Sequence, residues 1–142
     1  MVKCLAAGLI VLVLAGPAQA EVLISAQEAK LPESPFEDRG AFPGPKIVLV
    51  SPGDSAVAVK SPIHLRVRFE PRGAKIDPES LRVTYIKLEP VDLTERVRAF
   101  AGVDGIDFKD AEVPPGTHKI RIELRDSDGV TGGTDIVLKI AQ

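Results

Sequence analysis

The sequence predicts an all-β protein, an antiparallel β-sandwich with one short helix. Apolar and polar residues alternate through Ile63–Glu70, which is the pattern of a strand with one buried and one solvated face. Turn-forming residues separate runs of this kind about every 8 to 12 residues, which is typical of sandwiches. Long amphipathic helices, which would indicate parallel strands with helical crossovers, are missing from the sequence.

The first twenty residues have the features of a secretory signal peptide. Lys3 gives a positive start, Leu5 to Ala15 an apolar core, and Ala18-Gln19-Ala20 a cleavage site of small residues. A membrane-spanning helix is the competing interpretation, but it needs about 20 apolar residues and this run stops at Pro17. We therefore expect cleavage after Ala20, no membrane span, and a bacterial protein that is periplasmic or secreted.

Composition excludes several function classes. The chain has 18 basic and 20 acidic residues, and only Lys3 falls within the expected signal peptide, so neither nucleic acid nor an anionic membrane is an expected partner. The only cysteine, Cys4, also lies there, which leaves no thiol for a disulfide, a nucleophile or a metal site in the mature chain. Residues 21–142 are enough for one domain.

Residues 21–46 are expected to form a proline-rich linker before the domain. Ser25 and Glu28 have capping-box spacing and could start a helical turn through Leu31, but so short a helix needs tertiary contacts. Two interpretations stay open: the segment is a disordered tether, or aromatic residues pin it to the domain. The residues concerned are Pro32, Pro35, Pro43 and Pro45, with Phe36 and Phe42 as the possible pins.

The domain itself is expected over residues 47–142. Ile47–Ser51 forms a first strand, a turn follows at Ser51–Asp54, and Ala56–Lys60 forms a short second strand that Pro62 interrupts. Ile63–Phe69 is the clearest strand of the chain because its alternation is unbroken.

The second half of the domain continues the same pattern. A turn at Asp77–Ser80 precedes a strand at Leu81–Ile86, and Asp92 with Glu95 can cap a helix that turns Leu93, Val97 and Phe100 inward. A weaker strand and the strongest hairpin follow. These are Ile106–Val113, then His118–Leu124 joined through Asp126–Gly129 to Ile136–Ile140.

Four pieces of this pattern resemble the bacterial immunoglobulin-like and fibronectin type III-like domains of envelope proteins. They are Ser51–Asp54, Pro62–Phe69, Ile76–Ser80, and Pro115–His118 leading to Asp126–Gly129. The resemblance covers Ile47 to Ala141 and implies a structural module of immunoglobulin-like fold, not an activity. Such domains usually carry an aromatic residue, often tyrosine, two residues after the glycine, where it ties the corner to nearby backbone. This chain has His118 there, and we expect His118 to substitute for it.

Neither a catalytic site nor a metal or cofactor site is expected. His64 and His118, the only histidines, have opposite phases in their strands and should not converge. Asp126 and Asp128 invite a calcium interpretation, but the spacing lacks the other oxygen ligands, and tight hairpins select Asp and Gly for the turn itself. The copper-carrying proteins of similar sandwich topology use histidines with methionines, or an amino-terminal histidine, as ligands. The expected mature chain begins at Glu21 and contains no methionine.

A surface for a protein partner is the one positive functional expectation. If the strands of Leu81, Ile120 and Ile136 share a sheet, Ile86 and Val137 could meet on its outer face as a small apolar patch. Polar and charged neighbours would rim this patch, as they do in protein interfaces, although single exposed aliphatic residues are also ordinary. The candidate partner-binding residues are Ile86, Val137, Lys119, Arg121 and Arg82.

The sequence therefore predicts a non-enzymatic interaction module that binds another envelope or secreted protein. The alternative is a β-sandwich that binds a small ligand or a carbohydrate. Sites of that kind usually stack aromatic side chains on the ligand, and this chain has no Trp, one Tyr and five Phe.

Overall fold

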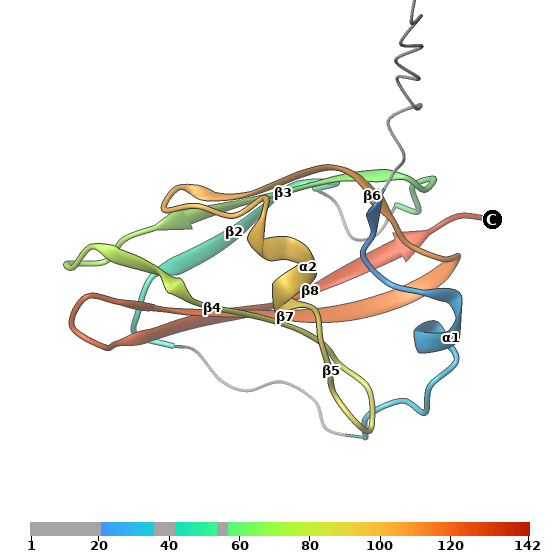
Figure 1. Ribbon diagram of the computed structural model, residues 1–142, viewed down its shortest axis with the longest axis horizontal. Helices are drawn as coiled ribbons and strands as arrows, with labels where there is room; N and C mark the ends of the chain where they lie inside the picture. The colour runs from blue at the N-terminus through green and yellow to red at the C-terminus, as the bar shows by residue number, and fades with distance from the viewer. Residues whose placement is uncertain (1–20, 36–41, 54–56) are drawn as a thin grey trace, which may run out of the picture.

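The computed structural model describes residues 21–35, 42–53 and 57–142, and these form the expected all-β sandwich (Figure 1). Within these ranges there are two four-stranded sheets, which we call sheet A and sheet B, and two short helices. The predicted signal peptide, residues 1–20, lies outside the described residues. Neither described helix is long and apolar enough to cross a membrane.

Sheet A contains one strand from the N-terminal end of the described chain and three from the domain. Its order is β1 (Glu21–Val22), β6 (Gly105–Glu112), β3 (Ile63–Glu70) and β2 (Lys46–Ser51). Sheet B has the order β5 (Val91–Asp92), β4 (Ile76–Tyr85), β7 (Gly116–Asp126) and β8 (Thr131–Ile140). All pairs are antiparallel except β1 with β6.

The core lies between the inner faces of the two sheets, as the alternating sequence predicts. Along β3 every second side chain is buried, beginning with Ile63, and β7 and β8 show the same alternation. The helix α2 (Thr94–Arg98) lies beside β4 at the front of Figure 1, where Leu93 and Val97 fill the open side of the sandwich. Burial of these apolar faces is the main force that holds the sheets together.

The expected linker differs from the structure, because residues 21–35, here called the N-terminal arm, belong to the folded sandwich. Leu23 is fully buried and Ile24 almost so. The Leu23 and Ile24 amides both donate to the Glu112 carbonyl, at 3.0 and 3.3 Å, and β1 runs parallel to β6. The helix α1 (Ala26–Ala29) follows. A proline-rich composition therefore conceals two core residues, and Phe36 lies outside the described residues.

Two expected local elements also differ. Of the predicted strand Ala56–Lys60, the described part forms only one parallel bridge, from Val59 to Ile140, and Ala56 lies outside the described residues. The predicted turn at Asp77–Ser80 is instead a register shift within β4. There the Ser80 hydroxyl accepts a hydrogen bond from the Arg125 amide at 2.7 Å, so the ladder between β4 and β7 continues through a side chain.

The β7–β8 hairpin is confirmed, with its turn at Asp126–Gly129. The Asp126 carboxylate is buried and accepts hydrogen bonds from the amides of Asp128 and Val130, each at 2.9 Å. Gly129 has φ of +78°, a conformation that glycine adopts without strain. These contacts are those of a turn-forming aspartate.

Candidate interaction surface

Three of the five candidate partner-binding residues lie in one row on the outer face of sheet B. The strands β4, β7 and β8 are neighbours, as the candidate surface requires. Lys119 is in register with Val137, and the Ile86 amide donates to the Lys119 carbonyl at 2.9 Å. Ile86, Lys119 and Val137 are each half-buried. We call this row the sheet B row.

The row differs in one respect from the expected patch. Ile86 and Val137 do not adjoin, because β7 lies between their strands and separates them by two strand spacings, about 9 to 10 Å. Lys119 therefore stands at the centre of the surface and not at its rim. The aliphatic part of a lysine side chain can cover apolar neighbours while its ammonium group stays in water.

Arg121 and Arg82 have different positions on the same face. Arg121 donates two hydrogen bonds to Asp135 on β8, at 2.7 and 3.0 Å, and the two side chains are only 18% and 15% exposed. This bidentate pair connects β7 to β8 next to the row. Arg82 is exposed, lies opposite Glu123, and is four residues from Ile86 along the chain, so the structure does not bring it into the row.

Phe42 also contacts this face, as the pinning interpretation expects. A Cβ atom on Gly133 would lie 3.1 Å from the Phe42 ring and 3.3 Å from the Glu123 side chain. The chain after the N-terminal arm therefore returns to the outer face of sheet B at Phe42. From there Gly44 donates its amide to the Thr131 carbonyl at 2.9 Å.

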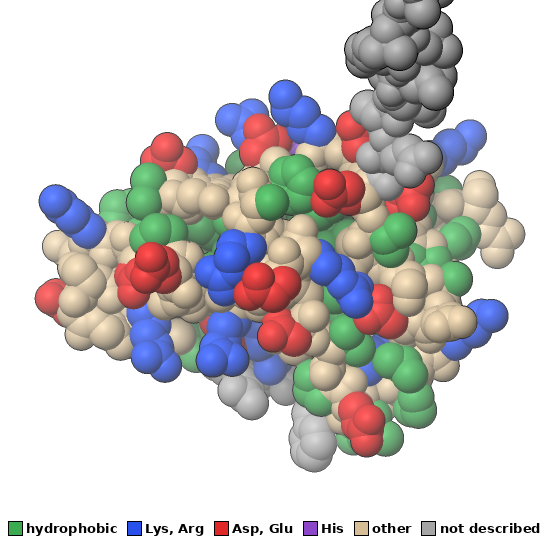
Figure 2. All heavy atoms as spheres, viewed as in Figure 1, with side chains coloured by type: hydrophobic (Ala, Val, Ile, Leu, Met, Phe, Trp, Pro, Cys, Tyr) green, Lys and Arg blue, Asp and Glu red, His purple; other side chains and the backbone are tan. Residues whose placement is uncertain are grey.

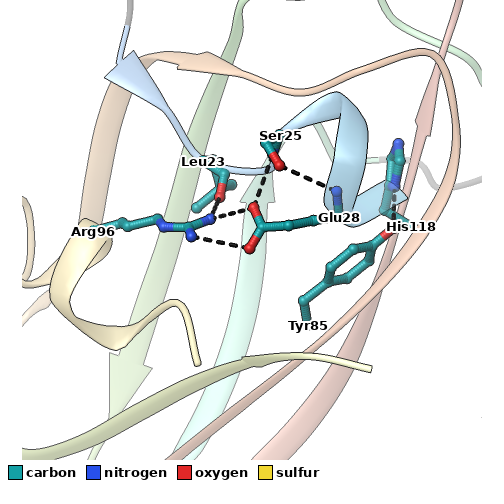
Figure 3. A network of polar contacts seen from close by, with 6 residues as sticks. All are labelled: Leu23, Ser25, Glu28, Tyr85, Arg96 and His118. Atoms are coloured by element: carbon teal, nitrogen blue, oxygen red, sulfur yellow. Dashed lines mark hydrogen bonds and ion pairs between the residues drawn. The ribbon is translucent and has the colours of Figure 1, made fainter. Parts of the chain in front are cut away.

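A second polar cluster, which fastens the N-terminal arm, was not predicted beyond its capping box (Figure 3). Ser25 Oγ accepts from the Glu28 amide and Glu28 accepts from the Ser25 amide, at 3.1 and 3.0 Å. Arg96 on α2 donates two hydrogen bonds to Glu28, at 2.6 and 2.9 Å, and one to the Leu23 carbonyl at 2.9 Å. The Arg96 guanidinium holds the pKa of Glu28 at about 2, against burial.

His118 occupies the expected corner and is tied to backbone there. It is 2% exposed, and its Nε2 lies 2.7 Å from the Pro114 carbonyl oxygen. Because that oxygen only accepts, Nε2 carries the proton, and Nδ1 accepts from the Tyr85 hydroxyl at 2.8 Å (Figure 3). Burial lowers the pKa of His118 below its ordinary value, so the ring is neutral.

Lys87 continues this buried cluster toward the arm. Its side chain is 2% exposed, and Nζ donates to the Ala29 carbonyl at 3.2 Å and to the Glu33 carboxylate. The ammonium nitrogen also lies 5.0 Å from the centre of the Tyr85 ring, a distance suited to a cation–π contact. The cluster is thus a structural attachment of the arm to sheet B.

His64 lies elsewhere, so the two histidines do not converge. It is exposed on the outer face of sheet A, where Nε2 lies 2.5 Å from Asp107 on β6. In the described ranges, no three histidine, cysteine, aspartate or glutamate side chains gather in a way that could hold a metal ion.

A groove of about 440 Å³ runs between α2, β4 and β7. Acidic and basic side chains alternate on this side of the molecule, as Figure 2 shows. The groove is lined mainly by polar groups, among them Glu79, Arg82, Asp92, Glu95, Arg98 and Glu123. Arg98 is paired with Glu95 at 3.1 Å, and the Asp92 carboxylate accepts from the Thr94 amide at 2.9 Å.

Comparison with known proteins gives no family for this chain, since no family model, curated protein or solved structure matches it.

Proposed function

We propose that this chain is a non-enzymatic interaction module, exported to the periplasm or secreted, that binds another envelope or secreted protein through the outer face of sheet B. The observation that carries the proposal is the sheet B row, in which two aliphatic side chains flank a lysine on three adjoining strands. The aliphatic part of Lys119 can join Ile86 and Val137 in one apolar stretch, and the Arg121–Asp135 pair beside it is polar, whereas protein interfaces typically combine an apolar centre with a polar rim.

The surroundings of the row support a protein partner. The Arg121–Asp135 pair neutralises both charges beside it, so a docking surface there meets few unpaired charges apart from Lys119. The three strands also hold the row in a fixed geometry, which lowers the entropy that is lost on binding. No chemical step is needed for this function.

The double variant Ile86→Ser with Val137→Ser tests the proposal. Proteins crosslinked to the chain in the envelope of its own host are compared with those of the unchanged chain by mass spectrometry. We expect the yield of the dominant adduct to fall by about tenfold or more, the effect of losing apolar anchors at an interface. The matched control is Val48→Ser with Val50→Ser on β2 in sheet A, which should keep the adduct. Equal adduct yields from both double variants would show that the sheet B row is not part of the interface.

The alternative function, binding of a small ligand or carbohydrate, is favoured by one observation, the polar groove beside α2. Its charged and hydroxyl side chains could bind sugar hydroxyl groups, although its lining contains no aromatic residue. A thermal shift series with neutral and acidic sugars tests this alternative. A saturable rise in Tm that Arg98→Ala abolishes would favour the groove over the sheet B row.

A further inference from the structure

The edge of β8 is paired at both ends by other parts of this chain. The Thr131 and Lys139 carbonyls bond to Gly44 and Val59, on the side away from β7, and backbone groups alternate in direction along a strand. The N–H and C=O groups of the odd-numbered residues of β8 therefore point away from β7, and those of the even-numbered residues face it. At one end the Thr131 carbonyl accepts from the Gly44 amide at 2.9 Å, and at the other the Lys139 carbonyl accepts from the Val59 amide at 2.9 Å. Residues 44–45 approach so closely that a Cβ atom on Gly132 would lie 2.0 Å from the Pro45 oxygen.

Between these two ends the edge has hydrogen-bonding groups without a backbone partner in residues 21–35, 42–53 and 57–142. Gly133, Asp135 and Val137 present their N–H and C=O groups away from β7, and no backbone group of the described residues pairs with them. All three residues are half-buried, so solvent reaches this part of the strand. Proteins usually cover or charge a sheet edge, because an open edge is a template for another strand. We call Gly133–Val137 the open edge.

The length of the open edge limits what can pair with it. Five residues of an antiparallel strand span about 17 Å, at about 3.4 Å per residue. The ten-residue β8 of a second copy would meet Gly44–Pro45 at one end and Val59 at the other if it paired along its whole length. The open edge therefore fits a short extended segment.

Charge indicates which side chains such a segment would carry. Lys119 and Lys139 lie on the outer face near Val137, and within the described part of the chain neither has an ion-pair partner. Asp135, the acidic residue of the open edge, is already neutralised by Arg121. An acidic side chain on an added strand would lie beside Val137 and Lys139, and the long side chain of Lys119 could extend past Val137 toward it. Apolar side chains would alternate on the other face of the added strand.

From this geometry we propose that the open edge binds a short extended acidic segment of the partner protein by strand addition. The hydrogen bonds of the added backbone provide affinity, and Lys119 and Lys139 provide selectivity for acidic side chains. This inference rests on the proposed function, and it assigns the edge beside the sheet B row as the place where the partner's chain is held.

Displayed random nine-residue peptides, selected on the full-length gene product, are the probe. We expect enriched peptides to carry Asp or Glu between apolar residues. Val137→Pro removes one outward N–H without removing a bond to β7, and should weaken binding of the synthetic peptides by about tenfold or more. The matched control Val137→Thr keeps the N–H and should stay within about threefold.

Hydrogen exchange provides a readout that does not depend on any variant. On peptide binding the amides of Gly133, Asp135 and Val137 should exchange about tenfold more slowly, while those of β2 in sheet A should not change. Circular dichroism tests whether Val137→Pro is folded. The double variant Lys119→Glu with Lys139→Glu leaves the backbone groups of the edge unchanged and should weaken binding of the acidic peptides.

Several results would overturn strand addition. Strand addition fails if no peptides are enriched, if Val137→Pro leaves peptide binding intact, or if the protected amides lie elsewhere. It also fails if the chain self-associates and Val137→Pro abolishes the self-association, because the edge would then bind a second copy. If envelope crosslinks still depend on Ile86 and Val137 in any of these cases, the proposed function stands and only the strand-addition mode fails.

Discussion

His118 shows how a buried titratable residue makes the stability of this sandwich depend on pH. Its folded-state pKa lies below the ordinary value of 6.5 because burial penalises the imidazolium. The unfolded chain therefore binds more protons than the folded chain as pH falls through 6.5. The free energy of unfolding should decrease on acidification, from the ordinary pKa down to the lowered one.

Urea unfolding from about pH 8 to about pH 5 measures this dependence. The decrease in the free energy of unfolding below the ordinary histidine pKa should be lost in His118→Gln and retained in the matched variant His64→Gln, which leaves His118 in place. A slope that follows His64 instead would refute the assignment of a neutral, buried His118.

Sequence alone assigns His118 its corner position, because it stands two residues after Gly116, at the turn that begins the strand. It does not assign Tyr85 as the second partner, 33 residues away in the chain. Local spacing reveals contacts between neighbours in sequence, whereas a partner on another strand is fixed by register.

At the scale of elements, the N-terminal arm is attached mainly by Leu23 and Ile24. Truncation of a fully buried leucine typically costs about 2 to 5 kcal/mol. Leu23→Ala should therefore lower the free energy of unfolding by about this amount and make the arm sensitive to limited proteolysis. Val22→Ala is the matched control, because Val22 is the preceding residue and is 48% exposed. Equal effects of the two substitutions would contradict the placement of Leu23 in the core.

The Glu28–Arg96 pair adds a pH-dependent attachment of the same arm. Because Arg96 lowers the pKa of Glu28 from 4.5 to about 2, the pair contributes fully above pH 4.5 and is lost as pH falls toward 2. Proteolytic release of the arm by an acid-active protease should rise across this range. In Glu28→Gln the proteolytic release of the arm should be high at every pH in this range. The matched control Glu95→Gln removes the exposed pair with Arg98 and should behave like the unchanged chain.

The elements themselves were predicted unevenly, for physical reasons. Ser25 and Glu28 are three residues apart, so their capping box is visible in the sequence, but the bond from Glu28 to Arg96 spans 68 residues and is not. Asp77–Ser80 was interpreted as a turn because Asp, Pro and Ser favour turns. The Glu79 amide does donate to the Asp77 carboxylate at 3.1 Å, as in a turn, but the Arg125 amide also donates to Ser80 Oγ, so the segment is a bulge within β4.

At the scale of the whole molecule, the sandwich follows from alternation and turn residues, because these decide which side of each strand is buried. The order of the strands does not follow from them. Ile86 and Val137 have the correct phase for the outer face, yet only the position of β7 between β4 and β8 places Lys119 between them. Four prolines within residues 21–46 favour a linker, and two adjacent apolar residues, Leu23 and Ile24, are too short a pattern to indicate a buried strand.

Site-specific photocrosslinking in the cell tests whether the chain binds another protein through the outer face of sheet B. A photoreactive amino acid replaces Lys119 at the centre of the sheet B row, and in a second strain replaces Arg66 on the outer face of sheet A. We expect one dominant protein adduct from position 119 and background labelling from position 66. Background labelling from both positions, or the same adduct from both, would contradict a module that binds through the outer face of sheet B.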